Sequence, residues 1–295
     1  MVVNVKEYIK EYDLAFYNQE TIFGGPELGF SSYPRFNTPS EFGDAMLESG
    51  FNIVGLANNH SFDKGERGIM NALQYWQDKD VIYSGIADSK ESQENYQIKT
   101  MNNISYTMLS YTTLTNGLKA PAGKEYMVNV YNEDLVRKDI LAVRKNVDVL
   151  IVSMHWGVEY TNNPNSNQLE IARFLSDLGV DIIIGHHPHV LQPIEIINNT
   201  VVMYSLGNFI SAQDTTDKLI GALVGLNITK TVKENSKEIN ISIPEVELIY
   251  TSRDYTVILF HMMSTKYLSN YQYYYDKYNN ILTKMEPGVI VHPLN

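Results

Sequence analysis

The chain has 295 residues, 44% of them hydrophobic, and a formal net charge of −11 at pH 7. This length allows a large core, in one α/β domain or in a domain with a small extension. The acidic charge argues against nucleic acid as a partner. The chain contains no cysteine. Disulfides and thiolate ligands are therefore excluded, and any bound metal must rely on His, Asn, Asp and Glu side chains.

Membrane and export segments are not expected in this sequence. No stretch approaches the ~20 consecutive apolar residues of a membrane helix, and the first residues lack the apolar core of a secretory signal. The sequence therefore predicts no membrane segment and no signal or anchor in this chain.

The first half of the chain alternates apolar strands with amphipathic helices. Thr38 with Glu41, and Asp63 with Glu66, have the spacing of a capping box at the start of a helix. Residues 24–36 are rich in Gly, Pro and aromatics and predict a long loop, a kind of segment that tends to be functional. The expected elements are helices at 5–12, 38–49 and 63–78, strands at 14–17, 51–57, 81–83 and 104–111, and a second loop at 112–127.

The second half begins in the same way and then changes pattern. Solid apolar runs predict strands buried on both faces, as in a parallel sheet, whereas the later strands alternate apolar and polar residues and suggest an antiparallel or mixed second sheet. We expect a main domain at 1–230 and a strand-and-helix extension at 231–295 packed on it. The expected elements are helices at 133–146, 168–178 and 264–285, strands at 147–154, 180–185, 201–204, 222–229 and 239–250, and a charged turn at 233–237.

The stretch DIIIGHHPHVLQPIE, residues 181–195, is the focus of the functional prediction. Its apolar run predicts a buried strand, and Pro188 requires that the strand end before it. His186, His187 and His189 are thus delivered to a loop at the carboxyl edge of a sheet, where ligands bind in α/β proteins. Solvated loop histidines are the simpler alternative, but the H-x-H spacing favours a metal site.

Metal-competent residues follow four of the expected strands. One such strand end is common by chance, but four in one chain are hard to explain by solvated loops alone. Oxygen and nitrogen ligands of this kind build two-metal hydrolytic sites, so we expect them to converge on one or two Mn, Fe or Zn ions. The expected ligands are Glu20, Asn59, His155, His187 and His189.

His60 stands next to Asn59 and is the expected general acid or transition-state stabiliser. Asp63 has two interpretations that the sequence leaves open. It either lies behind the metal ligands and orients the ring of His60, or it serves only in the capping box with Glu66.

Six stretches of the sequence, in order, resemble motifs of the CapA family, the poly-γ-glutamate capsule synthesis proteins. They span about residues 12–209, which is most of the chain, whereas the last third matches no motif. They are YDLAFYNQET, GFSSYPRFNTP, FNIVGLANNHSFDKGERG, VDVLIVSMHWGVEY, VDIIIGHHPHVLQPIE and MYSLGNFI.

The resemblance implies the fold class: an α/β/β/α sandwich of two facing mixed sheets flanked by helices, similar to calcineurin-like metallophosphoesterases. It implies ligand roles for Asn59, His155, His187 and His189, with Glu20 where phosphoesterases carry a bridging Asp and His186 in the second shell or solvated. The family also carries a Gly-Asp motif before its Asn-x-Glu. No Gly-Asp precedes Asn18 here, so either the chain is truncated and its first strand is missing, or the protein lacks a ligand for the first metal. The missing segment would also have held the family's membrane anchor.

Three more residues are expected to contact substrate, each with a simpler alternative. Arg35, in the loop that matches the family, suits a carboxylate or phosphate group, although a surface role is the alternative. Trp156 can line the cleft or pack in the core, and Asn208 can bind substrate or form a turn with Gly207. Glu159 and Glu195 are acidic candidates near the site, with a solvated side chain as the simpler alternative, and His261 and His292 are interpreted as structural.

The resemblance implies a role in poly-γ-glutamate capsule biosynthesis or cell-envelope polymer handling, through a phosphoesterase-like, metal-dependent hydrolase site. The alternative is a non-catalytic export or polymer-binding subunit that retains the fold, and a third interpretation is a stand-alone phosphodiesterase. Expected partners are an anionic polymer or phosphoester substrate and other capsule-synthesis proteins. The family is membrane-anchored and extracytoplasmic. Fold alone does not determine substrate.

Overall fold

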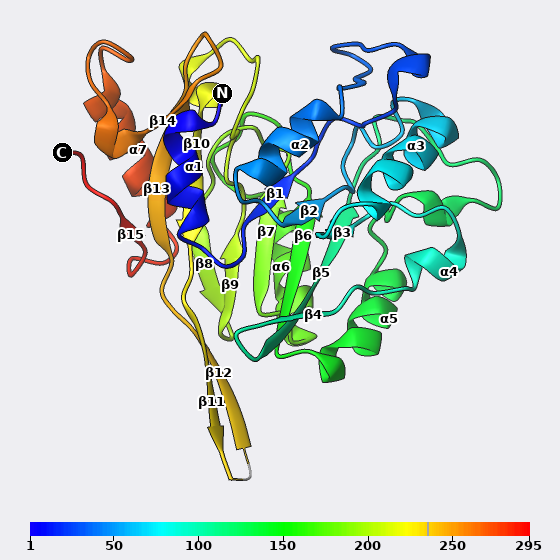
Figure 1. The fold of residues 1–295 in the computed structure, drawn as a ribbon. Helices are drawn as coiled ribbons and strands as arrows, with labels where there is room; N and C mark the ends of the chain where they lie inside the picture. Colours follow the sequence, from blue (N-terminus) through cyan, green and yellow to red (C-terminus); the bar gives the residue numbers. More distant parts are fainter. Residues whose placement is uncertain (235) are drawn as a thin grey trace. The chain divides into compact units, whose positions relative to one another are not determined.

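The computed structural model describes residues 1–234 and 236–295. They form two compact units: an N-terminal unit of residues 9–156, and a C-terminal unit of residues 157–295 together with residues 1–8 (Figure 1). Helix α1 (Val3–Lys10) runs from one unit into the other. Within the described ranges, no helix has the length and apolar character needed to cross a membrane. The predicted boundary between residues 230 and 231 stays a prediction.

The N-terminal unit contains two sheets. The first consists of three parallel strands in the order β1-β2-β3, and the second has the order β4-β5-β6, with β4 antiparallel and β6 parallel to β5. The strands are β1 (Phe16–Asn18), β2 (Ile53–Gly55), β3 (Ile82–Ser84), β4 (Lys99–Met101), β5 (Ile104–Thr112) and β6 (Val149–His155).

The two sheets of the N-terminal unit lie close together. The Ser84 hydroxyl accepts a hydrogen bond from the backbone N–H of Ser110 at 3.1 Å, which ties β3 to β5. A Cβ atom added to Gly55 would lie only 2.9 Å from Ser153 Oγ, so a glycine is required where β2 passes β6. The carboxyl end of β2 is therefore held against the second sheet.

Helices follow the strands of the N-terminal unit in the expected places, but both expected capping boxes are wrong. Helix α2 begins at Glu41 with Ser40, not Thr38, in the N-cap position, and Thr38 instead donates to Thr21 Oγ1 at 2.7 Å. Helix α3 begins after Lys64, and no side chain caps it. The side chains of Thr38 and Asp63 do not cap these helices because they bind residues far away in the sequence, Thr21 and Phe36. The helices are α2 (Glu41–Glu48), α3 (Gly65–Gln77), α4 (Lys90–Gln93) and α5 (Glu133–Val143).

The first strand of the C-terminal unit is β7 (Ile182–His186), which the solid apolar run predicted and which pairs in parallel with β9 (Thr200–Met203). Strand β8 (Ile194–Ile197) is antiparallel to β9 and was not predicted. Helix α6 (Ser166–Asp177) precedes β7, and helix α7 (Tyr271–Leu282) lies inside the range expected to be helical.

The late strands differ from the prediction, because each expected strand is divided in two. Strand β10 pairs with β13, which also pairs with β14 and β15, whereas β11 and β12 form a separate hairpin that extends from its unit (Figure 1). Pro244, which has no N–H to donate, separates β12 from β13. Asn235, in the expected charged turn, lies outside the described residues. The strands are β10 (Ile220–Gly225), β11 (Ile228–Lys233), β12 (Ser236–Ile241), β13 (Glu245–Thr251), β14 (Val257–Leu259) and β15 (Ile290–Val291).

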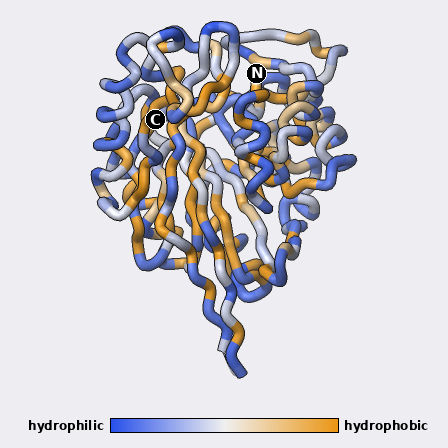
Figure 2. Tube along the Cα trace, turned by 60° about the vertical axis from the view of Figure 1, so that its left-hand side comes forward, coloured by the Kyte–Doolittle hydropathy of each residue, from blue (hydrophilic) through white to orange (hydrophobic). Residues whose placement is uncertain are grey.

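Apolar residues concentrate along the strands (Figure 2). The largest fully buried side chains include Trp76, Trp156 and Tyr111. Parallel and antiparallel pairings occur in the same sheets, and helices follow the strands. The predicted fold class, α/β with mixed sheets and flanking helices, is confirmed.

Candidate metal centre

The turn after β2 presents Asn59 and His60, and its neighbour Asn58 holds it in place. Asn58 Oδ1 accepts from the backbone N–H of His60 at 2.9 Å, which is the side-chain-to-backbone pattern typical of an Asx turn. Asn58 Nδ2 donates to the carbonyl of Gln19, also at 2.9 Å. One buried asparagine therefore connects the end of β2 to the end of β1, where Glu20 lies.

Asp63 orients the ring of His60. Its Oδ2 lies 2.7 Å from His60 Nδ1, and the same oxygen accepts from the backbone N–H of Phe36 at 2.7 Å. The ring of Phe36 stands edge-on to the imidazole, with centroids 4.7 Å apart. Both His60 and Asp63 are buried. Because a carboxylate only accepts hydrogen bonds, this contact favours the tautomer with the proton on Nδ1 and directs Nε2 away from Asp63. The orienting role of Asp63 is the alternative that the structure supports.

Glu20 and His155 approach each other in the N-terminal unit. His155 is the last residue of β6 and is fully buried. Its Nε2 lies 3.9 Å from Glu20 Oε1. Asn18 Nδ2 is 3.5 Å from the other carboxylate oxygen of Glu20. Two of the predicted ligands are thus neighbours.

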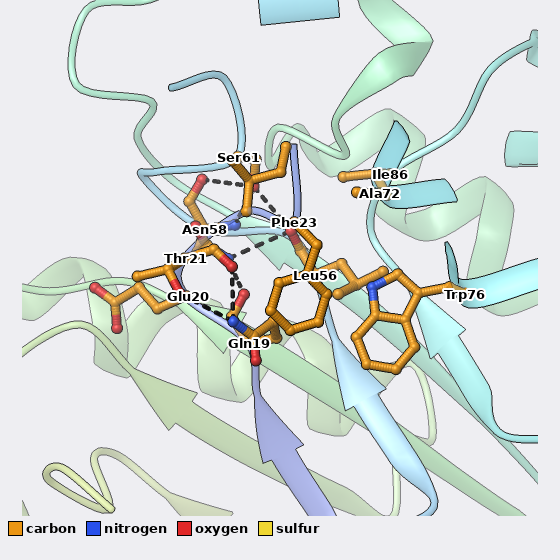
Figure 3. A pocket seen from close by; sticks show the side chains of 11 residues that line it. Gln19, Glu20, Thr21, Phe23, Leu56, Asn58, Ser61, Ala72, Trp76 and Ile86 are labelled. Atoms are coloured by element: carbon orange, nitrogen blue, oxygen red, sulfur yellow. Dashed lines mark hydrogen bonds between the residues drawn. The ribbon is translucent and has the colours of Figure 1, made fainter. Parts of the chain in front are cut away.

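A small pocket lies beneath the segment that carries Glu20 (Figure 3). Gln19 Nε2 donates to the carbonyl oxygen of Thr21 at 2.6 Å and to its hydroxyl at 3.0 Å. These two local hydrogen bonds fix the backbone on both sides of Glu20. The pocket is lined by Gln19, Glu20, Thr21, Ile22, Phe23, Leu56, Asn58, Ser61, Ala72, Trp76 and Ile86.

The amide of Asn59 has a defined orientation. Its Nδ2 donates to Asn116 Oδ1 at 3.3 Å, so its Oδ1 points the other way. That oxygen is buried and accepts no hydrogen bond from any residue that the structure describes. A buried acceptor of this kind needs a partner, and a cation is one that an amide oxygen can bind. Asn116 was missed by the sequence analysis, since nothing in the loop at 112–127 marks it.

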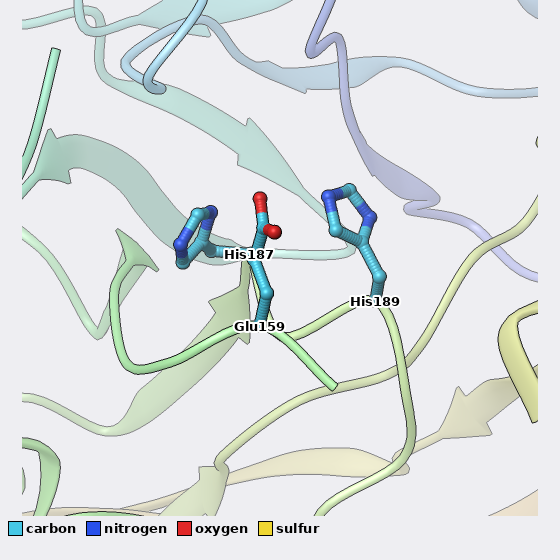
Figure 4. Close-up of side chains that lie close together, drawn as sticks. All are labelled: Glu159, His187 and His189. Atoms are coloured by element: carbon cyan, nitrogen blue, oxygen red, sulfur yellow. The ribbon is translucent and has the colours of Figure 1, made fainter. Parts of the chain in front are cut away.

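Glu159, His187 and His189 form a cluster in the C-terminal unit. One ligand atom of each lies within 4.8 Å of those of the other two, and Figure 4 shows the carboxylate between the imidazole rings. Both histidines have positive φ angles, 97° and 57°, so the backbone is bent in the way that presents two alternate side chains together. Glu159, for which the sequence left a solvated side chain as the simpler alternative, is part of this group.

Asn208 and Tyr160 support His189. Asn208 Oδ1 lies 2.9 Å from His189 Nδ1, an arrangement that leaves Nε2 directed elsewhere, as in metal-bound histidines. Tyr160 stacks on the imidazole at 6.1 Å, and its backbone N–H donates to the carbonyl of Pro188 at 2.7 Å. The structure therefore gives Asn208 a contact with a predicted ligand, and its substrate-binding role stays a prediction.

The other predicted site residues are placed differently. His186 is half-buried, its Nε2 is buried, and burial lowers the pKa of His186 to about 3; its role beside the ligands stays a prediction. Trp156 is fully buried, which favours the core alternative, whereas Arg35 is exposed. Glu195 accepts from Tyr204 at 2.7 Å.

The predicted ligands fall into two groups. Glu20, Asn59 and His155 belong to the N-terminal unit, and His187 and His189 belong to the C-terminal unit with Glu159. Their convergence on a single site stays a prediction. In chemical terms, the molecule is an α/β protein with a histidine-and-carboxylate group able to hold a divalent cation.

The family described as "Bacterial capsule synthesis protein PGA_cap" matches residues 1–213, and the chain belongs to this family. The chain is 35% identical over 200 residues to the PGA biosynthesis protein CapA of Bacillus subtilis (strain 168), covering 66% of this chain and 52% of that protein. It is 33% identical over 185 residues to the capsule biosynthesis protein CapA of Bacillus anthracis, covering 61% of this chain and 45% of that protein. The chain thus spans about half the length of these relatives.

Among solved structures, a hypothetical protein from Thermus thermophilus is similar, with a TM-score of 0.50 and 12% identity. The match covers 81% of this chain and 91% of that one. At this identity the likeness concerns the fold alone, and it agrees with the α/β architecture described above.

Proposed function

We propose that this protein acts in the biosynthesis of a poly-γ-glutamate capsule, or in the handling of a related cell-envelope polymer, and that it carries a metal-dependent hydrolase site. Its family membership supports the biological role. By the same analogy we place it outside the cytoplasm, with other capsule-synthesis proteins as partners and an anionic polymer or a phosphoester as substrate.

The residues present fit a divalent cation. Glu159, His187 and His189 offer a carboxylate and two imidazoles in one group, and Asn59 offers a buried amide oxygen without a hydrogen-bond donor among the described residues. We assign Glu159, His187 and His189 as ligands in the C-terminal unit, and Glu20, Asn59 and His155 as ligands in the N-terminal unit. This nitrogen and oxygen set suits Mn, Fe or Zn. When bound, such an ion polarises a carbonyl or phosphoryl oxygen as a Lewis acid.

The observation that carries the catalytic part of the proposal is the 2.7 Å contact between His60 and Asp63. Hydrolysis of an amide or phosphoester adds water across the broken bond, and the leaving nitrogen or oxygen must gain a proton. We assign this proton transfer to His60 Nε2, because Asp63 holds the opposite nitrogen and so fixes the direction of the ring. Arg35 is the candidate for binding an anionic group of the substrate.

The first test is the metal content of the purified protein, before and after incubation with Mn or Zn, compared with a His187→Ala/His189→Ala variant. We expect about one or two equivalents in the wild type and fewer in the variant. His261→Ala, in the same unit but outside the group, is the matched control. No bound metal in the wild type would refute the metal site.

The second test separates a hydrolase from a binding subunit. Asp63→Asn keeps the size of the side chain but removes the charge beside His60, and we expect turnover of γ-linked glutamate polymer or of a chromogenic phosphodiester to fall by about 10²-fold or more. If the wild type binds polymer but never releases shorter chains or free phosphate, the non-catalytic alternative is correct.

A further inference from the structure

A rigid loop lies beside the His60–Asp63 pair. Residues 24–37 close through Asn37, which is 1% exposed. Asn37 Oδ1 accepts from the Gly24 N–H at 2.7 Å, and its Nδ2 donates to the carbonyls of Gly25 and Gly29 at 2.8 and 3.0 Å. A backbone pair between Ser31 and Asn37 narrows the loop further. Its shape is therefore set internally, without help from a ligand.

The tip of this loop exposes large aromatic side chains to solvent, where they do not contribute to the hydrophobic core. Phe30 is 52% exposed and Tyr33 is 79% exposed. Arg35 is exposed as well. Rigid backbone that holds aromatic rings and an arginine in solvent is typical of a binding surface.

The first turns of α3 add positive charge to the same surface. Asn71 Nδ2 donates to the carbonyl of Gly24 at 2.6 Å, and the stem of Lys64 packs so close to Gly24 that a Cβ atom there would lie 3.2 Å from Lys64 Cγ. Arg67 lies three residues after Lys64 and four before Asn71, which places the three residues along one side of the helix. The helix therefore presents Lys64 and Arg67 beside the loop.

The basic side chains of this surface are available to bind a ligand, whereas its carboxylates already have partners within the protein. Among the residues that the structure describes, Arg35, Lys64 and Arg67 form no ion pair. The two carboxylates of the same segments are engaged, Glu27 by the Asn71 amide and Glu66 by Lys124 at 2.5 Å. In a chain with a net charge of −11, this is a local surface suited to an anion.

Phe36 connects this surface to the pair formed by His60 and Asp63. Phe36 follows Arg35 directly, donates its N–H to Asp63 and packs its ring against His60. A chain bound to Arg35 is therefore held next to the group assigned to proton transfer.

We propose that residues 24–37 and the start of α3 form a docking surface for an anionic peptide polymer, whose successive carboxylates bind Arg35, Lys64 and Arg67 while its methylene groups pack on Phe30 and Tyr33. This inference rests on the proposed function, since a γ-linked glutamate chain has both features: one carboxylate per residue and apolar methylenes between them. The guanidinium groups bind carboxylates through paired hydrogen bonds. The rings supply apolar contact that salt does not screen.

The experiment measures binding of a fluorescent γ-linked oligoglutamate to the whole chain over a range of salt concentrations. In Arg35→Gln/Lys64→Gln/Arg67→Gln we expect the Kd to rise about tenfold or more at low salt, and its salt dependence to flatten, because charge-assisted contacts are lost. Phe30→Ala/Tyr33→Ala should weaken binding at every salt concentration and leave the slope unchanged. The matched control, Lys90→Gln/Lys138→Gln/Lys145→Gln, removes the same charge from exposed lysines elsewhere in the unit and should bind like the wild type.

The outcomes separate this inference from the proposed function. If the His187→Ala/His189→Ala variant loses metal and turnover but still binds the oligomer through the three cations, the docking surface stands on its own. If the wild type hydrolyses the polymer and the triple Gln variant binds it as tightly as the wild type, the docking surface is refuted while the hydrolase stands. Single-stranded DNA of equal charge that binds as tightly as the oligomer would also overturn the proposal, because the site would then not select a carboxylate polymer.

Discussion

Asn116 offers a direct test of the metal centre without touching a ligand. Its Oδ1 accepts from Asn59 Nδ2 at 3.3 Å and so turns the Asn59 oxygen toward the proposed cation. In Asn116→Ala that amide loses its orientation. One neutral hydrogen bond is worth about 0.5–1.5 kcal/mol net, which corresponds to an increase of about 2- to 13-fold in the Kd for the metal. Since 3.3 Å is long for such a bond, we expect about fivefold or less.

The assay is calorimetric titration of the metal-free protein with Mn²⁺, because it does not depend on activity. Asn116 has a φ of 51°, so Ala would also strain the backbone. Asn116→Gly removes the side chain without that strain and should weaken metal binding equally. Asn102 has the same φ of 51° and lies in the turn between β4 and β5, so Asn102→Ala controls for strain. The reasoning is refuted if both Asn116 variants bind metal like the wild type, or if Asn102→Ala weakens binding as much.

Two further predictions concern buried polar groups away from the centre. Tyr111→Phe removes a 2.8 Å hydrogen bond to buried Asp139 and should lower the free energy of unfolding in urea by about 1.5–3 kcal/mol. Tyr17→Phe removes a buried hydroxyl with no partner among the described residues, so its free energy of unfolding should be unchanged or higher. A larger loss of stability in the Tyr17 variant than in the Tyr111 variant would contradict this. His292→Ala removes the contact at 3.3 Å with Glu247, a carboxylate buried in β13, and should cost about 1.5–3 kcal/mol. If the melting temperature falls no more than it does for a surface His→Ala change, the contact between His292 and Glu247 does not stabilise the fold.

The structure gives His261 and His292, which were interpreted as structural, a partner that the sequence did not reveal. His261 and His292 had no obvious partner, since neither lies near an acidic residue in a recognisable pattern. In the structure, both contact Glu247, with His261 Nδ1 at 3.1 Å from it. These residues are far apart along the chain, and the sheet pairing of β13 with β14 and β15 brings them together.

Local pattern predicted the elements well where burial alone determines them. The solid apolar run before His186 became β7, and the run before His155 became β6, because a strand buried on both faces must be apolar at every position. The histidines that end these strands followed from the same argument. Strand ends inside alternating segments were less predictable, since short breaks such as the one at Pro244 depend on which neighbour each half joins.

The sequence by itself determined the α/β class and most strands of the N-terminal unit, and it predicted five candidate ligands. The tertiary structure alone decided what each polar side chain contacts. Asp63 has the spacing of a helix cap, yet it binds His60 and the N–H of Phe36, a residue 27 positions earlier. Asn116 carries no local signal, and Glu159 is placed near the site by its motif but gains its histidine neighbours only in the fold. Burial is periodic within one helix or strand, so the hydrophobic pattern of that element can be recognised in the sequence. The hydrogen-bond partner of a polar side chain depends on groups that only the folded chain brings within reach, so the sequence alone does not identify it.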